Sequence, residues 1–315
     1  MRPNFRRIAY VSLLTTLALS IQAISFAQTC TMEVNQNDPS ATYKTINAAI
    51  TVATPGSVIC VHPGVYEESV TVSGVTLKAL KGPEVTVIQS PDGTGTGATL
   101  TGNQNVAIIG FRVQGFATGI NPDTNGGDTK ISNCIATGNS GNGFVLGSSM
   151  PQSAKIVNNI SADNGDNGFY TSISGANLMS FFNNIAYRNG NYGLYGGGYL
   201  DAKWGDYSCT FGNTSGDRKD SQVGAHHITS DPLIDSTKHY RFTSQSSPCV
   251  NTGHPASFYL DPDGSISDMG AYGGPESRNW WRDPFNGPVV ENVTVDPPQV
   301  VPGGTITIRA TARTE

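Results

Sequence analysis

Charged side chains are scarce in this chain of 315 residues, and lysine and arginine form no cluster along it. Asp, Glu, Lys and Arg together supply 14% of the residues, and the formal net charge is -5. Without a basic patch, neither nucleic acid nor an anionic membrane surface is expected as a partner. The low charge and the 37 glycines disfavour a helical bundle and indicate a turn-rich β architecture with many positions of positive φ.

Long apolar runs are missing after the first segment of the chain. Residues 1–27 combine a cationic start (MRPNFRR), an apolar segment and a small-x-small site at Ser25 and Ala27, the three regions of a secretory signal. We therefore expect a mature protein that begins at Gln28 and is secreted or held at the cell surface. No later run approaches the ~20 apolar residues that a membrane-spanning helix requires, so no membrane span is expected.

The cysteines follow no CxxC metal-binding pattern. The chain has five of them, at Cys30, Cys60, Cys134, Cys209 and Cys249. In an exported chain, five cysteines permit up to two disulfides and leave at least one thiol.

What the sequence does contain is an internal repeat of 25 residues. The segments KISNCIATGNSGNGF (130–144), KIVNNISADNGDNGF (155–169) and SFFNNIAYRNGNYGL (180–194) align without a gap, and GDYSCTFGN from Gly205 is expected to keep the same phase. Four columns of this alignment hold similar residues: Asn133, Asn158 and Asn183; Asn139, Asn164 and Asn189; Gly143, Gly168 and Gly193; and Phe144, Phe169 and Leu194.

A repeat this short cannot bury its own apolar side, so successive rows must stack, and one turn of chain per row makes a parallel β-helix. Asn side chains in rungs ~4.8 Å apart can pass amide hydrogen bonds up the stack. The column that begins with Phe144 fills the interior, and alternation turns Tyr170 and Tyr195 outward. The same alignment puts Cys134 and Cys209 in one column, three rungs apart, and makes Cys134 the candidate for the free, buried thiol.

The two ends of the repeat region resemble a known superfamily. Residues 43–79, YKTINAAITVATPGSVICVHPGVYEESVTVSGVTLKA, are similar to the opening of pectin lyase-like proteins: a capping helix that ends near Ala53, a Pro-Gly turn and a buried strand around Ile59. The segments SDPLID (230–235), SQSSPCVNTG (244–253) and DPDGSISDMGAYGGP (261–275) resemble the closing segment of exported bacterial β-helix proteins. The resemblance implies an all-β, single-stranded right-handed parallel β-helix with a short N-terminal capping helix.

The chain divides accordingly into a signal (1–27), a β-helix domain (28–276), a linker (277–289) and a β tail (290–315). The tail alternates apolar and polar residues around a Pro-Gly turn, like the first two strands of an Ig-like sandwich. Too few strands follow to close a core. The tail is therefore either a packed strand pair or part of a longer sandwich.

Within the superfamily the sequence is most similar to family 9 pectate lyases, whose rungs carry an Asp-Asp-Gly-x-Asp motif that supplies calcium ligands. The matching positions here are Asp166, Asn167, Gly168, Phe169 and Tyr170. Only the first of them keeps its carboxylate, whereas calcium is held by several carboxylates. Calcium is thus the metal that the resemblance implies, with Asp166 and Asp206 as its candidate ligands.

The resemblance also implies β-elimination, which needs a base, usually an Arg or Lys held partly deprotonated. Asp163 and Arg188 share a column on adjacent rungs, where they form either an acid and a cationic base or a surface ion pair. Lys203 is the third candidate catalytic residue. The candidate substrate-binding residues are Tyr170, Tyr195 and Trp204, whose rings either stack on sugars or pack under a loop.

Two functions of different class follow from these patterns. The first is an exported protein that binds acidic polysaccharide and cleaves it by β-elimination. The second is a non-catalytic surface-adhesion or carbohydrate-binding module. The missing aspartates favour the second, as do rungs so regular from 130 to 213 that no long loop rises to wall a cleft.

Overall fold

The structure is a computed structural model that describes residues 29–124, 127–147, 150–151, 153–172, 179–197 and 206–281, together with the backbone of 289–296 and 307–313. The predicted signal (1–27) lies outside the described residues. Two candidate site residues, Lys203 and Trp204, also lie outside them.

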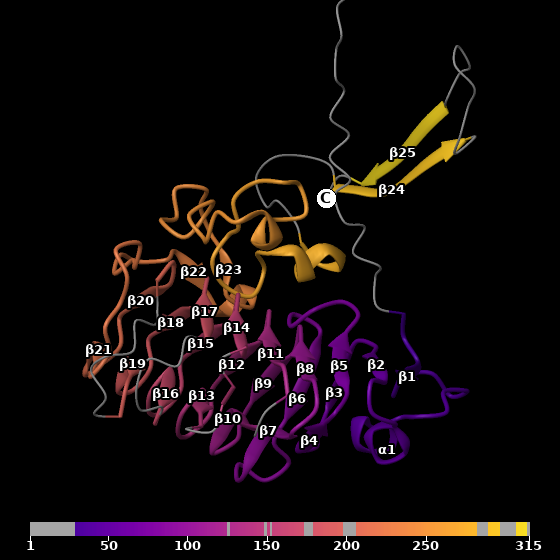
Figure 1. Ribbon diagram of the computed structural model, residues 1–315, viewed down its shortest axis with the longest axis horizontal. Helices are drawn as coiled ribbons and strands as arrows, with labels where there is room; N and C mark the ends of the chain where they lie inside the picture. Colours follow the sequence, from indigo (N-terminus) through magenta and orange to yellow (C-terminus); the bar gives the residue numbers. More distant parts are fainter. Residues whose placement is uncertain are drawn as a thin grey trace, which may run out of the picture.

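Three parallel sheets of seven strands each form the body of the protein (Figure 1). Sheet A contains β1 (Met32–Val34), β2 (Val58–Val61), β5 (Thr76–Ala79), β8 (Val106–Ile109), β11 (Thr129–Ser132), β14 (Lys155–Val157) and β17 (Ser180–Phe182). Sheet B contains β3 (Gly64–Tyr66), β6 (Thr86–Gln89), β9 (Arg112–Gln114), β12 (Ile135–Thr137), β15 (Ile160–Ala162), β18 (Ile185–Tyr187) and β20 (Cys209–Phe211). Sheet C contains β4 (Val70–Ser73), β7 (Thr96–Gly102), β10 (Thr118–Thr124), β13 (Phe144–Leu146), β16 (Phe169–Thr171), β19 (Tyr192–Tyr195) and β21 (Gly216–Lys219).

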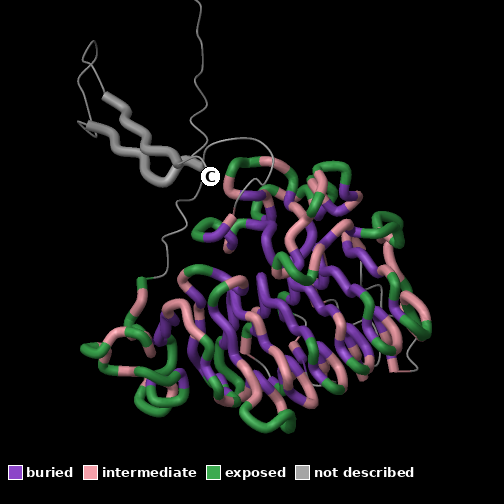
Figure 2. The backbone as a smooth tube through the Cα atoms, turned by 180° about the vertical axis from the view of Figure 1, so that it is seen from behind, coloured by how far each residue is buried: buried purple, intermediate pink, exposed green. Residues whose placement is uncertain are grey.

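The chain visits the sheets in turn and pairs each strand with the strand one rung earlier, which confirms the predicted parallel β-helix. The coil has about seven turns. Figure 2 shows buried residues along the strands and exposed residues at the turns. The interior column is as the repeat predicts. The rings of Phe144 and Phe169 stack with centroids 4.6 Å apart, and Leu194 continues the column on the next rung.

The asparagines at the bend between sheets B and C form a continuous amide ladder. Each Nδ2 donates to the Oδ1 one rung further on at 2.9 Å, in the order Asn139, Asn164, Asn189 and Asn213. The same oxygens accept the backbone N–H of the residue one rung earlier. A second ladder at the bend between sheets A and B joins Asn159 to Asn184 at 3.0 Å. Stacking therefore satisfies buried amides that a single turn of chain would leave unpaired.

The predicted phase of the fourth row is wrong by one residue. Asn213 follows Asn189 by 24 residues, and Cys209 lies opposite Ile185 rather than in the column of Asn184. Ser208 takes that place and accepts the N–H of Asn184 at 3.2 Å. The fourth row is one residue shorter than the other rows. The pairing register shifts by the same one residue, so each side chain of the row stays on its expected side of the sheet.

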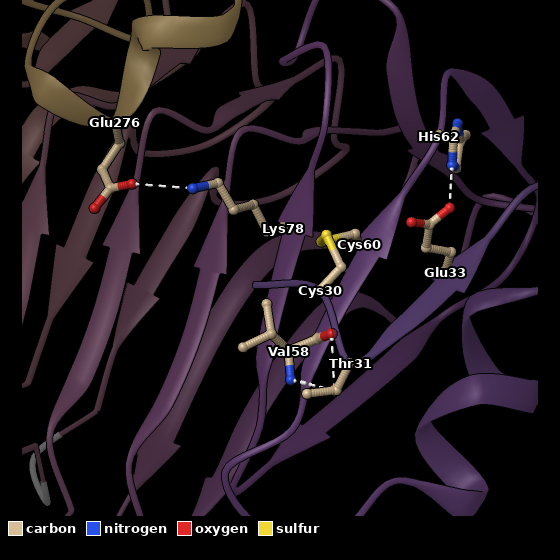
Figure 3. Close-up of a disulfide and its surroundings, with 8 residues drawn as sticks. All are labelled: Cys30, Thr31, Glu33, Val58, Cys60, His62, Lys78 and Glu276. Carbon is tan, nitrogen blue, oxygen red and sulfur yellow. Dashed lines mark hydrogen bonds and ion pairs between the residues drawn. A yellow bond between two sulfur atoms is a disulfide. The ribbon is translucent and has the colours of Figure 1, made fainter. Parts of the chain in front are cut away.

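The N-terminal end of the coil is closed by helix α1 (Ile46–Val52), within the predicted range. Thr45 caps the helix, and the carboxylate of Glu68 accepts the N–H groups of Ile46 (2.6 Å) and Asn47 (2.9 Å), where a negative charge stabilises the first turn. A disulfide between Cys30 and Cys60 ties the chain before β1 to β2 (Figure 3).

The other three cysteines are free and buried, so the structure has one disulfide where up to two were allowed. Cys134 is the free, buried thiol that the sequence predicts, and burial raises its pKa to about 12. The thiols of Cys209 and Cys249 contact each other. Their hydrogen bond, together with burial, raises the pKa of Cys249.

Residues 220–281, here called the cover segment, lie across the outer side of sheets A and B (Figures 1 and 2). The segment contains β22 (Ile234–Asp235), β23 (Arg241–Phe242) and the short 3-10 helices Ser236–Lys238, Ser257–Tyr259 and Pro275–Asn279. It forms a second apolar core outside the coil, in which Met269 and Tyr272 pack against outward residues such as Ile160 and Ile185. Trp280, at the start of the predicted linker, is 4% exposed. A Cβ on Gly82 would lie 2.4 Å from its indole ring.

A third asparagine column anchors the cover segment to the coil. Asn133, Asn158 and Asn183 adopt left-handed conformations with φ of 55° to 59°, which direct their side chains outward. The amide of Asn133 donates to the carbonyls of Ala271 and Gly273, and the amide of Asn158 donates to the carbonyl of Asp268. The side-chain oxygen of Asn183 accepts the N–H of His254. The carboxylate of Glu276 adds ion pairs to Lys78 and Lys130, one of which appears in Figure 3.

The tail consists of β24 (Val289–Asp296) and β25 (Thr307–Arg313), which pair antiparallel with a bulge between Val290 and Asn292. This is the strand pair that the alternating pattern predicts. In the described chain, the pair is joined to no third strand.

Replacing one ladder residue tests the amide stack. Asn164→Ala removes the acceptor of the Asn139 side chain and backbone N–H, both in the buried interior. We expect a loss of about 2 to 4 kcal/mol in the free energy of unfolding, because the buried N–H of Asn139 loses its partner and its side-chain amide keeps only its bond to the carbonyl of Val113. Denaturant unfolding measures it. Asn103→Ala, at an exposed turn, is the control and should change stability by under ~0.5 kcal/mol. An equally small effect of Asn164→Ala would contradict the ladder.

Candidate functional site

One column at the edge of sheet B has a backbone conformation that favours glycine. Gly115, Gly138 and Gly212 have φ of 79°, 62° and 70°, and the two rungs between them carry Asp163 (φ 53°) and Arg188 (φ 51°). A left-handed conformation costs a residue with a side chain about 1 to 2 kcal/mol. The two side chains therefore occupy positions where the backbone alone would favour glycine.

Asp163 and Arg188 form the predicted ion pair. Nη2 and Nε of Arg188 both lie 2.9 Å from Oδ1 of Asp163. The other carboxylate oxygen accepts the hydroxyl of Tyr240 at 2.8 Å, and that hydroxyl also bonds to Thr137. The guanidinium lies over the ring of Tyr187, 4.9 Å from its centroid.

This environment does not favour Arg188 as a base. The hydrogen bond that Arg188 donates to Asp163 raises the pKa of the guanidinium above its ordinary value, and burial opposes this only in part. A proton acceptor needs a shift in the other direction. The geometry matches the surface ion pair, which was one of the two alternatives for these residues. The catalytic roles of Asp163 and Arg188 stay predictions.

The outward face of sheet C carries three tyrosines and a lysine, here together called the aromatic strip: Tyr170, Tyr192, Tyr195 and Lys219. Tyr170 and Tyr195 are opposite each other on adjacent rungs, with ring centroids 5.4 Å apart and an angle of 67° between the planes. The ammonium of Lys219 lies 5.2 Å from the ring of Tyr195 and 5.4 Å from that of Tyr192. All three tyrosines are half-buried.

The strip and the ion pair lie on different faces, as the spacing predicts. Tyr170 and Tyr195 belong to sheet C, whereas Asp163 and Arg188 end the strands of sheet B, across the bend. The cover segment stands beside the ion pair through Tyr240 and does not build the strip.

The two predicted calcium ligands are not brought together. Asp166 accepts the amides of Asn167 (3.0 Å) and Asn191 (2.9 Å) at the bend before sheet C. Asp206 accepts the N–H of His226 at 2.9 Å on the row that leads into sheet B. No three His, Cys, Asp or Glu side chains converge anywhere in the described chain. The residues present therefore do not fit a family 9 type of calcium site, and calcium binding stays a prediction.

Sequence reasoning missed three contributors to these surfaces, one of which is Tyr192, 5.9 Å from the ring of Tyr195. Lys219 joins the strip because the short fourth row shifts the register by one residue, which a gapless alignment hides. Tyr240 reaches Asp163 from 77 residues away, a contact that no local pattern signals.

The comparisons agree with this architecture. The family model described as the right handed beta helix region matches residues 64–201, from β3 to just beyond β19. The chain is a right-handed parallel β-helix. No curated protein and no solved structure matches it significantly. None of the described helices of this β-helix protein is long and apolar enough to cross a membrane.

Glycine substitution tests whether Arg188 is kept for stability. We expect Arg188→Gly to change the free energy of unfolding by less than about 1 kcal/mol, because relief of the left-handed conformation offsets the loss of a half-exposed ion pair. Arg188→Ala keeps the strain and loses the pair, so it should be the less stable variant. Chemical denaturation compares the two. A loss above ~2 kcal/mol in the glycine variant would show that the β-helix depends on the pair itself.

Proposed function

We propose that this β-helix protein is exported and binds acidic polysaccharide along the outer face of sheet C. The aromatic strip is the observation that carries the proposal. The apolar face of a sugar ring packs on an aromatic side chain, and a sugar carboxylate is attracted to a nearby ammonium such as that of Lys219. Tyrosines repeated on adjacent rungs suit a polymer whose units also repeat along the coil axis.

The rest of this face suits an extended chain of sugars. The column of Tyr170 and Tyr195 continues on earlier rungs as Val145, Asn121 and Thr99. These side chains are small or can form hydrogen bonds, and none carries a charge. A glycan lying along the axis would therefore meet the charged and aromatic end first and hydroxyl or amide groups further along.

Export is supported by the disulfide and by the signal pattern of residues 1–27. Disulfides persist in oxidising compartments, and the Cys30–Cys60 bond ties the chain before β1 to β2. Cleavage is not part of the proposal, because the predicted base Arg188 has a raised pKa and belongs to another face. Binding without catalysis is thus the function that we favour.

Removing the two rings tests the proposal. We expect Tyr170→Ala combined with Tyr195→Ala to weaken binding of polygalacturonate about tenfold or more, because each stacked ring contributes about 1 kcal/mol. The melting temperature should fall by no more than a few degrees, since both rings lie outside the core. Affinity gel electrophoresis or calorimetry with polygalacturonate and alginate measures the binding.

Three controls sharpen the result. Tyr170→Phe with Tyr195→Phe keeps the rings and should keep most of the affinity. Lys219→Gln should weaken binding of a polyuronate but not of a neutral polysaccharide. Ultraviolet absorbance of unsaturated product, followed with and without calcium, would reveal a lyase. Unchanged affinity in the double alanine variant would refute the strip as the site.

A further inference from the structure

A second polar surface lies on the outer side of sheet B, away from the aromatic strip. It is a groove of about 570 Å³ between three rungs of the coil and the cover segment. Gln89, Arg112, Gln114 and Thr137 line it from strands β6, β9 and β12, and Ser236 and Tyr240 line it from the cover. Its volume is in the range of sites that hold small ligands.

The floor of the groove offers hydrogen bonds. Gln89, Gln114 and Thr137 share one column on successive rungs, and the amide of Gln114 donates to Gln89 at 2.8 Å. Ser90 and three glycines complete the lining, and a Cβ on two of these glycines, Gly93 and Gly138, would meet no atom within 4 Å. The groove is therefore open space bordered by amides and hydroxyls.

Arg112 breaks an otherwise apolar column. On successive rungs that column reads Val87, Arg112, Ile135, Ile160, Ile185 and Cys209. The isoleucines and Cys209 are covered by the apolar core under the cover segment. Arg112, the one charged residue of this column, lines the groove.

The guanidinium of Arg112 has no carboxylate partner. Arg188 and Arg241 each pair with an acid, but no ion pair in the described residues includes Arg112. Its Nη1 lies 2.7 Å from Nδ1 of His239, and its Nε is shielded from solvent without any hydrogen-bond partner. A half-buried cation without a carboxylate partner is stabilised by an anion placed beside it.

The neighbouring acids do not supply that anion. Asp163 is bonded to Arg188 and Tyr240. Asp92, on the loop beside Ser90, accepts hydrogen bonds from the hydroxyl and N–H of Thr94 and the hydroxyl of Ser90. The positive end of the groove is thus left for a ligand.

We propose that this groove binds the carboxylate of an acidic sugar, with Arg112 on the carboxylate and the amides and hydroxyls of the floor on the sugar hydroxyls. The site goes beyond the aromatic strip, because it lies on another sheet and binds a single sugar unit or a chain end rather than a long polymer. Inorganic sulfate is also an oxyanion but has no sugar hydroxyls. It therefore separates recognition of a sugar from recognition of an oxyanion.

Calorimetry with trigalacturonate tests the site in a protein that already carries Tyr170→Ala and Tyr195→Ala, so that the contribution of the strip is greatly reduced. We expect Arg112→Gln in this background to weaken binding about tenfold or more, as loss of a charge-assisted pair implies. Arg278→Gln, at an exposed position of the cover segment, is the matched control and should leave binding unchanged. Galactose and sulfate should bind much more weakly than trigalacturonate.

A second variant, at the mouth of the groove, tests the site even if Arg112→Gln fails to fold. The fold already accepts aspartate at the equivalent position one rung on, where Asp163 has φ 53°. Gly138→Asp places a carboxylate next to Arg112 and should abolish binding, whereas Gly138→Asn, of similar size, should weaken it less. Equal affinity in Arg112→Gln and its parent, or sulfate bound as tightly as trigalacturonate, would overturn the inference. Either result leaves the proposal for the aromatic strip unaffected.

Discussion

In-register stacking is the constraint on which the whole structure depends. No turn of this chain can satisfy its own asparagines or bury its own phenylalanines. Each interior amide finds its acceptor on the next rung, as in the 2.9 Å bond from Asn139 to Asn164. Because side chains of one column must repeat inside the coil, the outer faces are also organised in columns. The strip of Tyr170 and Tyr195, the pair of Asp163 and Arg188, and the amide floor of the groove are all products of this repetition.

The cover segment decides which outer face is available to a ligand. The apolar column of Ile135, Ile160 and Ile185 on sheet B would be exposed without it, and the second core seals that column. The seal is held by outward asparagines with positive φ and by Glu276. Burial alone would raise the pKa of that carboxyl, but Lys130 and Lys78 outweigh it and lower the pKa. At the edge of this cover, the rung that carries Arg112 is only partly covered and lines the groove.

Much of this arrangement follows from the sequence. The period of 25, the asparagine columns, the inward Phe144 and Phe169, the outward tyrosines and the buried thiol of Cys134 are local consequences of the repeat. The phase of the last row is not, because one missing residue before Cys209 cannot be located without the pairing partner. Contacts between the coil and the cover are equally hidden. Arg112 and His239 are 127 residues apart, and no pattern in either segment marks their contact. For the same reason, the sequence alone does not reveal that Tyr240 bonds to Asp163.

We propose that the coil binds acidic sugar on its outer columns through charge, hydrogen bonds and aromatic contact. A crystal structure of the protein with bound trigalacturonate tests this most directly. The account predicts sugar rings against Tyr170 and Tyr195 with a carboxylate near Lys219, and a second carboxylate against Arg112 in the groove. Sugar bound only on the face of sheet A or at an end of the coil would contradict it, as would crystals in which neither column carries sugar at saturating concentration.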